Sequence, residues 1–236
     1  MRLDAITTLS FDVVGTLIDH EAGIIEWYRT WLRRHRERID DATILADFAA
    51  VTRRLQAAQP AAPYTALLPR IHETIADAWG LDTDESEALD FRDSVRDWPA
   101  HGDAITALRQ LRERYHLVAV TNADAWALEQ MSRTLDEPFA ETVTSDAVGA
   151  NKPDPRVWQY LVDRLELPAD RILHCACSRE HDLISARTFG LATAWIDRRP
   201  SAEDASGDDA GEPFFRPDIH VHTLSELVGR LEQPAG

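Results

Sequence analysis

Short apolar stretches that alternate with helical spacing constrain the fold of this chain more than any other feature. Stretches rich in strand-forming residues occupy 5–11, 117–121, 142–145, 172–177 and 193–196. Helical patterns occupy 103–115, 126–135, 155–165 and 181–189, and a last expected edge strand at 218–221 precedes a helix at 225–232. Because repeated strand–helix units build a parallel sheet with helices on its faces, the sequence predicts a doubly wound α/β fold.

A long helical block interrupts this alternation directly after the first strand. Helical spacing predicts helices at 21–38, from about 41 to the Pro-containing break at 59–63, at 64–79 and at 85–96. We therefore expect an α/β core formed by 1–18 and 97–236, with residues 19–96 inserted as a helical unit. Residues 201–212 are rich in Ser, Asp and Gly and are expected to form a surface loop.

The acidic composition argues against two classes of partner. With 25 basic and 41 acidic residues the formal net charge is −16, whereas nucleic acids and anionic membranes attract basic surfaces. No stretch approaches the roughly 18 apolar residues of a membrane helix, and the first residues have no signal-like apolar region, so a cytoplasmic protein is expected. Cys175 and Cys177 are poorly placed for a disulfide and are expected to be free thiols. The sequence leaves the oligomeric state open.

An aspartate ends the first expected strand. In the segment 9–19, Asp12 follows the apolar strand, Gly15 allows a tight turn and Thr16 adds a hydroxyl beside it. The carboxyl ends of strands are where open α/β sheets bind ligands. Asp12 is therefore a candidate nucleophile, although an Asp at this position can equally cap the following turn.

The only lysine of the chain is a second candidate. Of the 25 basic residues, all except Lys152 are arginines, so a lysine has been kept at one position in a chain that otherwise uses arginine. A compact ammonium can fit between two carboxylates where a planar guanidinium cannot. We interpret Lys152 as functional rather than as a solvated loop residue.

Several motifs occur in an order that resembles a known superfamily. They are Asp12-Val13-Val14-Gly15-Thr16, Val120-Thr121-Asn122, Lys152-Pro153-Asp154-Pro155-Arg156-Val157-Trp158, and the segment 186–198. The set resembles the haloacid dehalogenase (HAD) superfamily of hydrolases, most closely its L-2-haloacid dehalogenase-like (type II) subfamily. The resemblance covers nearly the whole chain and implies a Rossmann-like core whose helical insertion, 19–96, is a cap over the site.

The resemblance also assigns roles to individual residues. Asp12 is expected to be the nucleophile, Lys152 to keep it ionised, and Asp182 to pair with Lys152 or position water. Hydroxyl, amide and guanidinium donors suit a small anionic substrate. The expected substrate-binding residues are Thr16, Arg54, Thr121, Asn122, Trp158, Cys177, Ser178 and Arg179. Arg54 is expected to serve as the cap arginine. Arg179 is expected either to bind a substrate carboxylate or to be solvated. His181 is expected to be a surface histidine rather than a general base.

Two departures from the phosphatases of the superfamily favour dehalogenation. The leaving-group acid of phosphatases is replaced by Val14, which cannot transfer a proton; a leaving alkoxide needs that acid, and a halide does not. An expected magnesium-binding acid is replaced by Cys177, a poor ligand for a hard cation. The dehalogenases of the superfamily likewise lack both acids.

The leading hypothesis is therefore hydrolytic dehalogenation of a small 2-haloacid through a covalent aspartyl ester, with no metal and no cofactor. The alternative enzyme is a HAD phosphatase that acts on a small phosphorylated metabolite and requires magnesium. A non-hydrolytic binding protein on the same scaffold is the least favoured class, since Asp12, Lys152 and Asp182 are all present.

Overall fold

The computed structural model describes residues 3–59, 62–198 and 215–232 and confirms the α/β fold. Its centre is a six-stranded sheet in the order β3-β2-β1-β4-β5-β6, and every neighbouring pair is parallel. The strands are β1 Thr8–Phe11, β2 His116–Val120, β3 Glu141–Val143, β4 Ile172–Ala176, β5 Ala192–Ile196 and β6 Ile219–Val221. The loop expected at 201–212 lies outside the described residues.

The first strand lies in the middle of the sheet. Phe11 is level with Ala119 of β2 on one side and with Cys175 of β4 on the other. The strand order runs outward from β1 to β3 and then resumes at β4 on the opposite side, and such a reversal leaves a crevice at the carboxyl ends of the strands. Asp12 directly follows β1 and therefore stands at this crevice.

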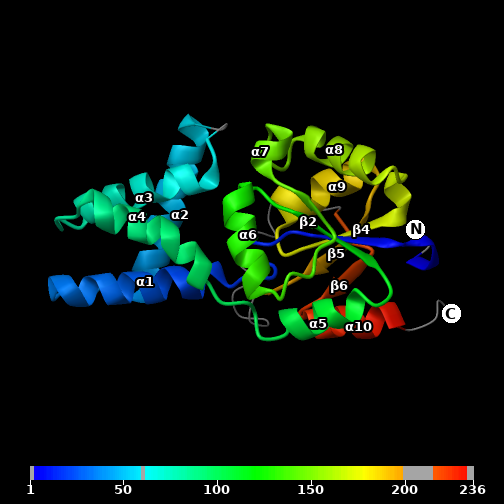
Figure 1. Cartoon of the computed structure of the whole chain (residues 1–236), viewed down its shortest axis with the longest axis horizontal. Coiled ribbons are helices and arrows are strands. Elements are labelled where there is room, and N and C mark those ends of the chain that lie inside the picture. The colour runs from blue at the N-terminus through cyan, green and yellow to red at the C-terminus, as the bar shows by residue number, and fades with distance from the viewer. Residues whose placement is uncertain (1–2, 60–61, 199–214, 233–236) are drawn as a thin grey trace.

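Helices cover both faces of the sheet. Figure 1 shows α5 and α10 together on one face, and α7, α8 and α9 on the other. The core helices are α5 Ala104–Leu111, α6 Ala125–Thr134, α7 Ser145–Val148, α8 Pro155–Leu165, α9 Ile184–Phe189 and α10 Leu224–Glu232. In the part of the chain that the structure describes, no helix combines the length and apolar character that crossing a bilayer requires.

The helices that follow β1 lie beside the sheet, at the carboxyl ends of its strands (Figure 1). They are α1 His20–His35, α2 Asp41–Ala58, α3 Tyr64–Ala78 and α4 Glu85–Asp93. Asp19, Asp40 and Asp84 cap three of them, since each carboxylate accepts a backbone N–H three residues on, at 2.9–3.0 Å. These caps explain why the sequence begins its helices there. The boundaries of an inserted unit at 19–96 stay a prediction.

One glycine fixes how the first of these helices meets the core. A Cβ atom added to Gly23 in α1 would lie 2.2 Å from the ring of Trp98, which is itself 1% exposed. Only glycine lets the helix approach the indole this closely. The contact joins α1 to the segment that returns the chain to the sheet, where Asp19 N donates to Pro99 O at 2.8 Å.

Two local structures differ from the sequence expectation. The strand expected at 142–145 ends at Val143, and the short helix α7 begins at Ser145. The helix expected at 181–189 begins instead with a π-helical turn, η4 Arg179–Leu183, before α9. The turn carries Asp182, a buried side chain that bonds Lys152. Helix propensity does not predict this π-helical turn, because the turn carries Asp182, which bonds a lysine distant in the sequence.

Candidate active site

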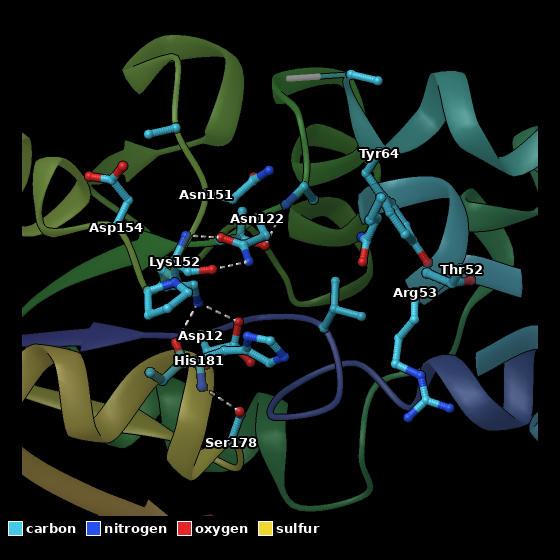
Figure 2. Close-up of a pocket in the computed structure, with 18 of the residues that line it drawn as sticks. Asp12, Thr52, Arg53, Tyr64, Asn122, Asn151, Lys152, Asp154, Ser178 and His181 are labelled. Carbon is cyan, nitrogen blue, oxygen red and sulfur yellow. Dashed lines mark hydrogen bonds and ion pairs between the residues drawn. The ribbon is translucent and has the colours of Figure 1, made fainter. Parts of the chain in front are cut away.

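A cavity of about 730 Å³ lies between the carboxyl ends of the strands and the helical block. Figure 2 shows Asp12, Asn122 and Lys152 on the core side of the cavity, with Thr52 and Arg53 of α2 opposite them. The core side is built from strand ends and the loop before α8. The opposite side comes from one face of α2 and the start of α3, so two regions distant in sequence form one site.

Asp12 is held at both carboxylate oxygens. Thr16 Oγ1 donates to Oδ2 at 2.7 Å, and Lys152 Nζ donates to Oδ1 at 2.8 Å. The backbone N–H of Asp12 donates to Cys175 O at 3.1 Å, which extends the sheet by one residue and fixes the direction of the side chain. Gly15 then turns the chain with φ of 86°, a conformation that favours glycine. Each carboxylate oxygen keeps a further lone pair, so the group remains able to attack a carbon atom.

Lys152 uses all its donors inside the protein. Its ammonium donates to Asp12 Oδ1, to Asp182 Oδ1 and to the backbone carbonyl of Val120, and the residue is 3% exposed. Burial alone would lower the pKa of Lys152, but Asp12 and Asp182 outweigh burial and raise it above its ordinary value. The lysine is therefore charged and holds the two carboxylates together.

A buried histidine supports this ion cluster from behind. His174 lies on β4, and its Nε2 is 3.0 Å from Asp182 Oδ1 while its Nδ1 is 2.9 Å from Ser10 Oγ. Burial lowers the pKa of His174, so the neutral ring can donate from Nε2 to Asp182 and accept from Ser10. Asp182 is buried too, which would raise its pKa, but Lys152 and His174 lower it. His174 is not among the residues predicted from the sequence. The one sequence feature that points to it is its place as a polar residue within an apolar strand.

Thr121 and Asn122 follow β2 and line the cavity, as expected of residues at a strand end. The side chain of Asn122 clamps the loop of Lys152, because Oδ1 accepts from Lys152 N at 2.7 Å and Nδ2 donates to Lys152 O at 3.1 Å. Thr121 Oγ1 accepts from Ala123 N at 3.1 Å. These contacts give Asn122 a role in positioning Lys152 that sequence analysis did not foresee.

The arginine of α2 that borders the cavity differs from the one expected as the cap arginine. Arg53 lines the cavity and Arg54 does not. The face of α2 that borders the cavity carries Ala49, Thr52, Arg53 and Gln56, at helical spacing beside the buried stripe. Arg54 is one residue further round the helix, about 100° away, and is exposed.

Three further expected substrate-binding residues lie away from the cavity. Trp158 is fully buried in α8, where its Nε1 donates to Ser185 Oγ at 3.1 Å. The guanidinium of Arg179 lies 5.3 Å from the ring centroid of Trp195. Cys177 is behind the turn at Gly15, and burial raises the pKa of its thiol to about 12. By contrast, Ser178 and His181 both line the cavity, as Figure 2 shows.

His20, at the start of α1, is a cavity residue that sequence analysis missed. Its ring packs over the turn after Asp12, where a Cβ atom added to Gly15 would lie 3.5 Å from its Nδ1. Among the atoms that the structure describes, this buried Nδ1 has no hydrogen-bond partner. Burial lowers the pKa of His20, while Glu21, Asp19 and Asp12 act in the opposite direction. A neutral imidazole with an unused nitrogen thus borders the cavity near Asp12.

The donor set at Asp12 does not fit a magnesium ion. Asp12 and Asp182 share the ammonium of Lys152, and Asp182 also accepts from His174. The position where a third acid would complete an oxygen ligand set is Cys177, and magnesium prefers oxygen ligands. Lys152 already supplies positive charge beside the carboxylate of Asp12.

The sheet order, the buried Asp12–Lys152–Asp182 cluster and the adjoining helical block define a HAD-type hydrolase. A family model described as haloacid dehalogenase-like hydrolase matches residues 6–175, and the chain belongs to this family. The chain is 28% identical to (S)-2-haloacid dehalogenase H-109 of Pseudomonas putida over 54% of this chain and 58% of that protein. It is 24% identical to (S)-2-haloacid dehalogenase 4A of Burkholderia cepacia over 95% and 94%. A crystal structure of an L-2-haloacid dehalogenase superposes with a TM-score of 0.84 at 23% identity, covering 96% of this chain and 98% of that one.

Proposed function

We propose that this chain hydrolyses the carbon–halogen bond of a small 2-haloacid by way of a covalent ester on Asp12. The observation that carries the proposal is the carboxylate of Asp12, which Thr16 and Lys152 hold in a cavity that the apolar side chain of Val14 also lines. A halide leaves as a stable anion and needs no proton, so this wall is no handicap to dehalogenation. An alkoxide leaving from phosphorus would need an acid there.

In the first step, a carboxylate oxygen of Asp12 attacks C2 of the substrate, and the halide leaves with the bonding electron pair. An aspartyl ester forms at the expense of the carbon–halogen bond. Lys152 stays charged throughout and donates to Asp12 Oδ1, so its positive charge lies beside the nucleophile. Arg53 provides positive charge on the opposite wall of the cavity for the substrate carboxylate or the departing halide.

In the second step, water attacks the carboxyl carbon of Asp12 and the bond from that carbon to the ester oxygen breaks. The product 2-hydroxy acid keeps the oxygen that came from Asp12, and Asp12 gains the oxygen of water. Asp182 is a poor base for this water because Lys152 and His174 lower its pKa and occupy it. We assign to Nδ1 of His20 both the removal of a proton from this water and its return to the leaving oxygen of the hydroxy acid; the ring is neutral, and this buried atom has no hydrogen-bond partner among the described atoms.

The helical block 19–96 serves as the cap in this proposal. Thr52, Arg53 and Gln56 of α2 line the cavity together with Tyr64 at the start of α3. A cap that covers the core residues excludes bulk water and presents the side chains that choose the substrate. The core then supplies the nucleophile and its ion cluster, and the cap supplies specificity and, through His20, the base.

The deciding experiment compares halide release with phosphate release. The purified chain is incubated with L-2-chloropropionate or with an aryl phosphate, each with EDTA and with millimolar magnesium. We expect halide release that EDTA does not reduce, and weak phosphate release under both conditions. Magnesium-dependent phosphate release without turnover of any haloacid would replace the proposal with the phosphatase alternative.

A single-turnover reaction in ¹⁸O-labelled water tests the covalent step. With enzyme in excess, the label should enter the peptide that contains Asp12 and be absent from the hydroxy acid. Label in the product alone would mean that water displaces the halide directly, and the ester mechanism would be wrong.

A further inference from the structure

A group of metal-ligating side chains stands on the sheet away from the catalytic cavity. Strand β6 carries Ile219 and Val221 inward, 2% and 4% exposed, whereas His220 and His222 are exposed. His222 directly follows β6, and the centroids of the two imidazole rings are 5.4 Å apart. Trp195 of β5 pairs with His220, and Asp197 directly follows the end of β5 at Ile196.

Backbone pairing fixes the carboxylate beside the two histidines. Asp197 N donates to Val221 O at 2.8 Å, which holds the residue between His220 and His222. Its Oδ2 is 3.5 Å from His220 Nε2, and its carbonyl oxygen is 3.3 Å from His222 Nδ1. One ligand atom from each of the three side chains lies within 4.8 Å of the others. Among the described residues, this is the one cluster of three His, Cys, Asp or Glu side chains with that spacing.

The surroundings restrain the ligands without covering them. The ring of His220 stacks on Trp195, with centroids 4.3 Å apart and planes at 12°, yet its side chain remains 46% exposed. Arg198, the residue after Asp197, donates to Asp103 at 2.9 Å and to the carbonyl of Thr16. The overall charge of −16 also attracts cations to the surface.

We propose that Asp197, His220 and His222 bind a divalent transition metal, with Zn²⁺ the best match. Two imidazole nitrogens and one carboxylate oxygen are ligands that zinc prefers, whereas magnesium and calcium prefer oxygen alone. Tetrahedral ligands at about 2.0–2.1 Å from zinc are roughly 3.3 Å apart. The His220–Asp197 pair, at 3.5 Å, already has nearly this spacing, and a rotation of the exposed His222 ring completes the set. Water fills the fourth position.

The metal would join the ends of β5 and β6. β6 is a three-residue edge strand that follows a segment outside the described residues, and a cross-strand metal adds stability where backbone pairing is short. Because β4 lies between β1 and β5, this site is separate from Asp12. The inference therefore does not depend on the proposed dehalogenation.

Calorimetric titration of the full chain with Zn²⁺, after treatment with a chelator, tests the site. We expect one equivalent to bind, and to bind at least about tenfold more weakly in His220→Ala and in His222→Ala. His116→Ala is the matched control, since His116 is an exposed histidine at the amino end of β2. Titration with Co²⁺ should give visible absorption bands of a nitrogen–oxygen site in the wild type and in His116→Ala only.

His220→Ala also removes the stacking on Trp195, so thermal unfolding of His222→Ala serves as a second measurement. Zn²⁺ should raise the Tm of the wild type and of His116→Ala, and leave the Tm of His222→Ala unchanged, because His222 does not carry that stacking. Absence of Zn²⁺ binding to the wild type would overturn the proposal. So would binding that both β6 variants retain, or that Asp12→Asn abolishes.

Discussion

The two walls of the cavity differ in how their polar groups are satisfied. On the core wall, Asp12, Lys152 and Asp182 are 2–7% exposed and bonded to one another. On the wall formed by the helical block, Arg53 is exposed, and the buried Thr52 Oγ1 and His20 Nδ1 lack hydrogen-bond partners in the described part of the chain. A closed ion network fixes the position of the nucleophile. The wall of the helical block thus has polar atoms without partners among the described residues, whereas the ion cluster of the core wall is bonded internally.

This difference predicts that changes on the core wall affect rate far more than changes on the opposite wall. The largest effect is expected for Asp12→Asn, since the amide is nearly isosteric but weakly nucleophilic. Halide release should fall by at least about 10⁴-fold. Mass spectrometry of the wild type quenched during turnover should show the substrate adduct on the Asp12 peptide. An active variant, or an adduct elsewhere, would contradict the mechanism.

Lys152→Arg tests whether the core wall needs a compact charge rather than any charge. The ammonium donates to three oxygens in a fully buried position, and a guanidinium is too large for it. We expect kcat to fall roughly 10²- to 10³-fold. Arg164→Lys is a control for arginine–lysine exchange, because Arg164 is exposed in the last turn of α8 and does not line the cavity, and it should retain near wild-type kcat. Near wild-type kcat in Lys152→Arg would mean that the lone lysine is an accident of composition.

The contrast between the walls also separates what the sequence predicts from what it does not. Asp12, Asn122 and Ser178 follow parallel strands, so topology alone brings them to one edge of the sheet. Lys152 is predicted by composition, since it is the lysine kept among arginines. These predictions depend on chain order and residue type, which a sequence states directly.

The opposite wall is set by geometry that a sequence does not state. The difference between Arg53 and Arg54 is about 100° of helix rotation, which depends on how α2 packs against its neighbours. His20 reaches the cavity because α1 begins immediately beyond the turn at Gly15 and closes on Trp98 through Gly23. Likewise, the burial of His174 and Trp158 follows from which faces of β4 and α8 meet. Tertiary packing decides each of these positions.

His20→Gln tests the comparison between the two walls, because His20 lies on the wall formed by the helical block and is nevertheless assigned a step of the reaction. Glutamine keeps a polar side chain of similar reach yet cannot take a proton from water. We expect the first turnover to release halide at nearly the wild-type rate and ester hydrolysis to slow roughly 10²-fold, so that the Asp12 adduct accumulates. His181→Gln is the matched control, as His181 also lines the cavity, and it should show no accumulation. Equal burst and steady-state rates in His20→Gln would reject His20 as the base.

The smallest effect is expected for the arginines of α2, and it should appear in KM rather than in kcat. Arg53 borders the cavity from an exposed position, where its charge is partly screened by water, so its contact with a carboxylate is weaker than a buried one. Arg53→Gln should raise KM for a 2-haloacid about tenfold and change kcat less than about threefold. Arg54→Gln removes the same charge one residue away and should leave both constants unchanged, since Arg54 does not border the cavity. If Arg54→Gln raises KM and Arg53→Gln does not, Arg54 rather than Arg53 is the arginine that contacts the substrate. If Arg53→Gln lowers kcat as strongly as Lys152→Arg does, Arg53 takes part in the chemical step, and its assignment as a residue that only binds the substrate does not hold.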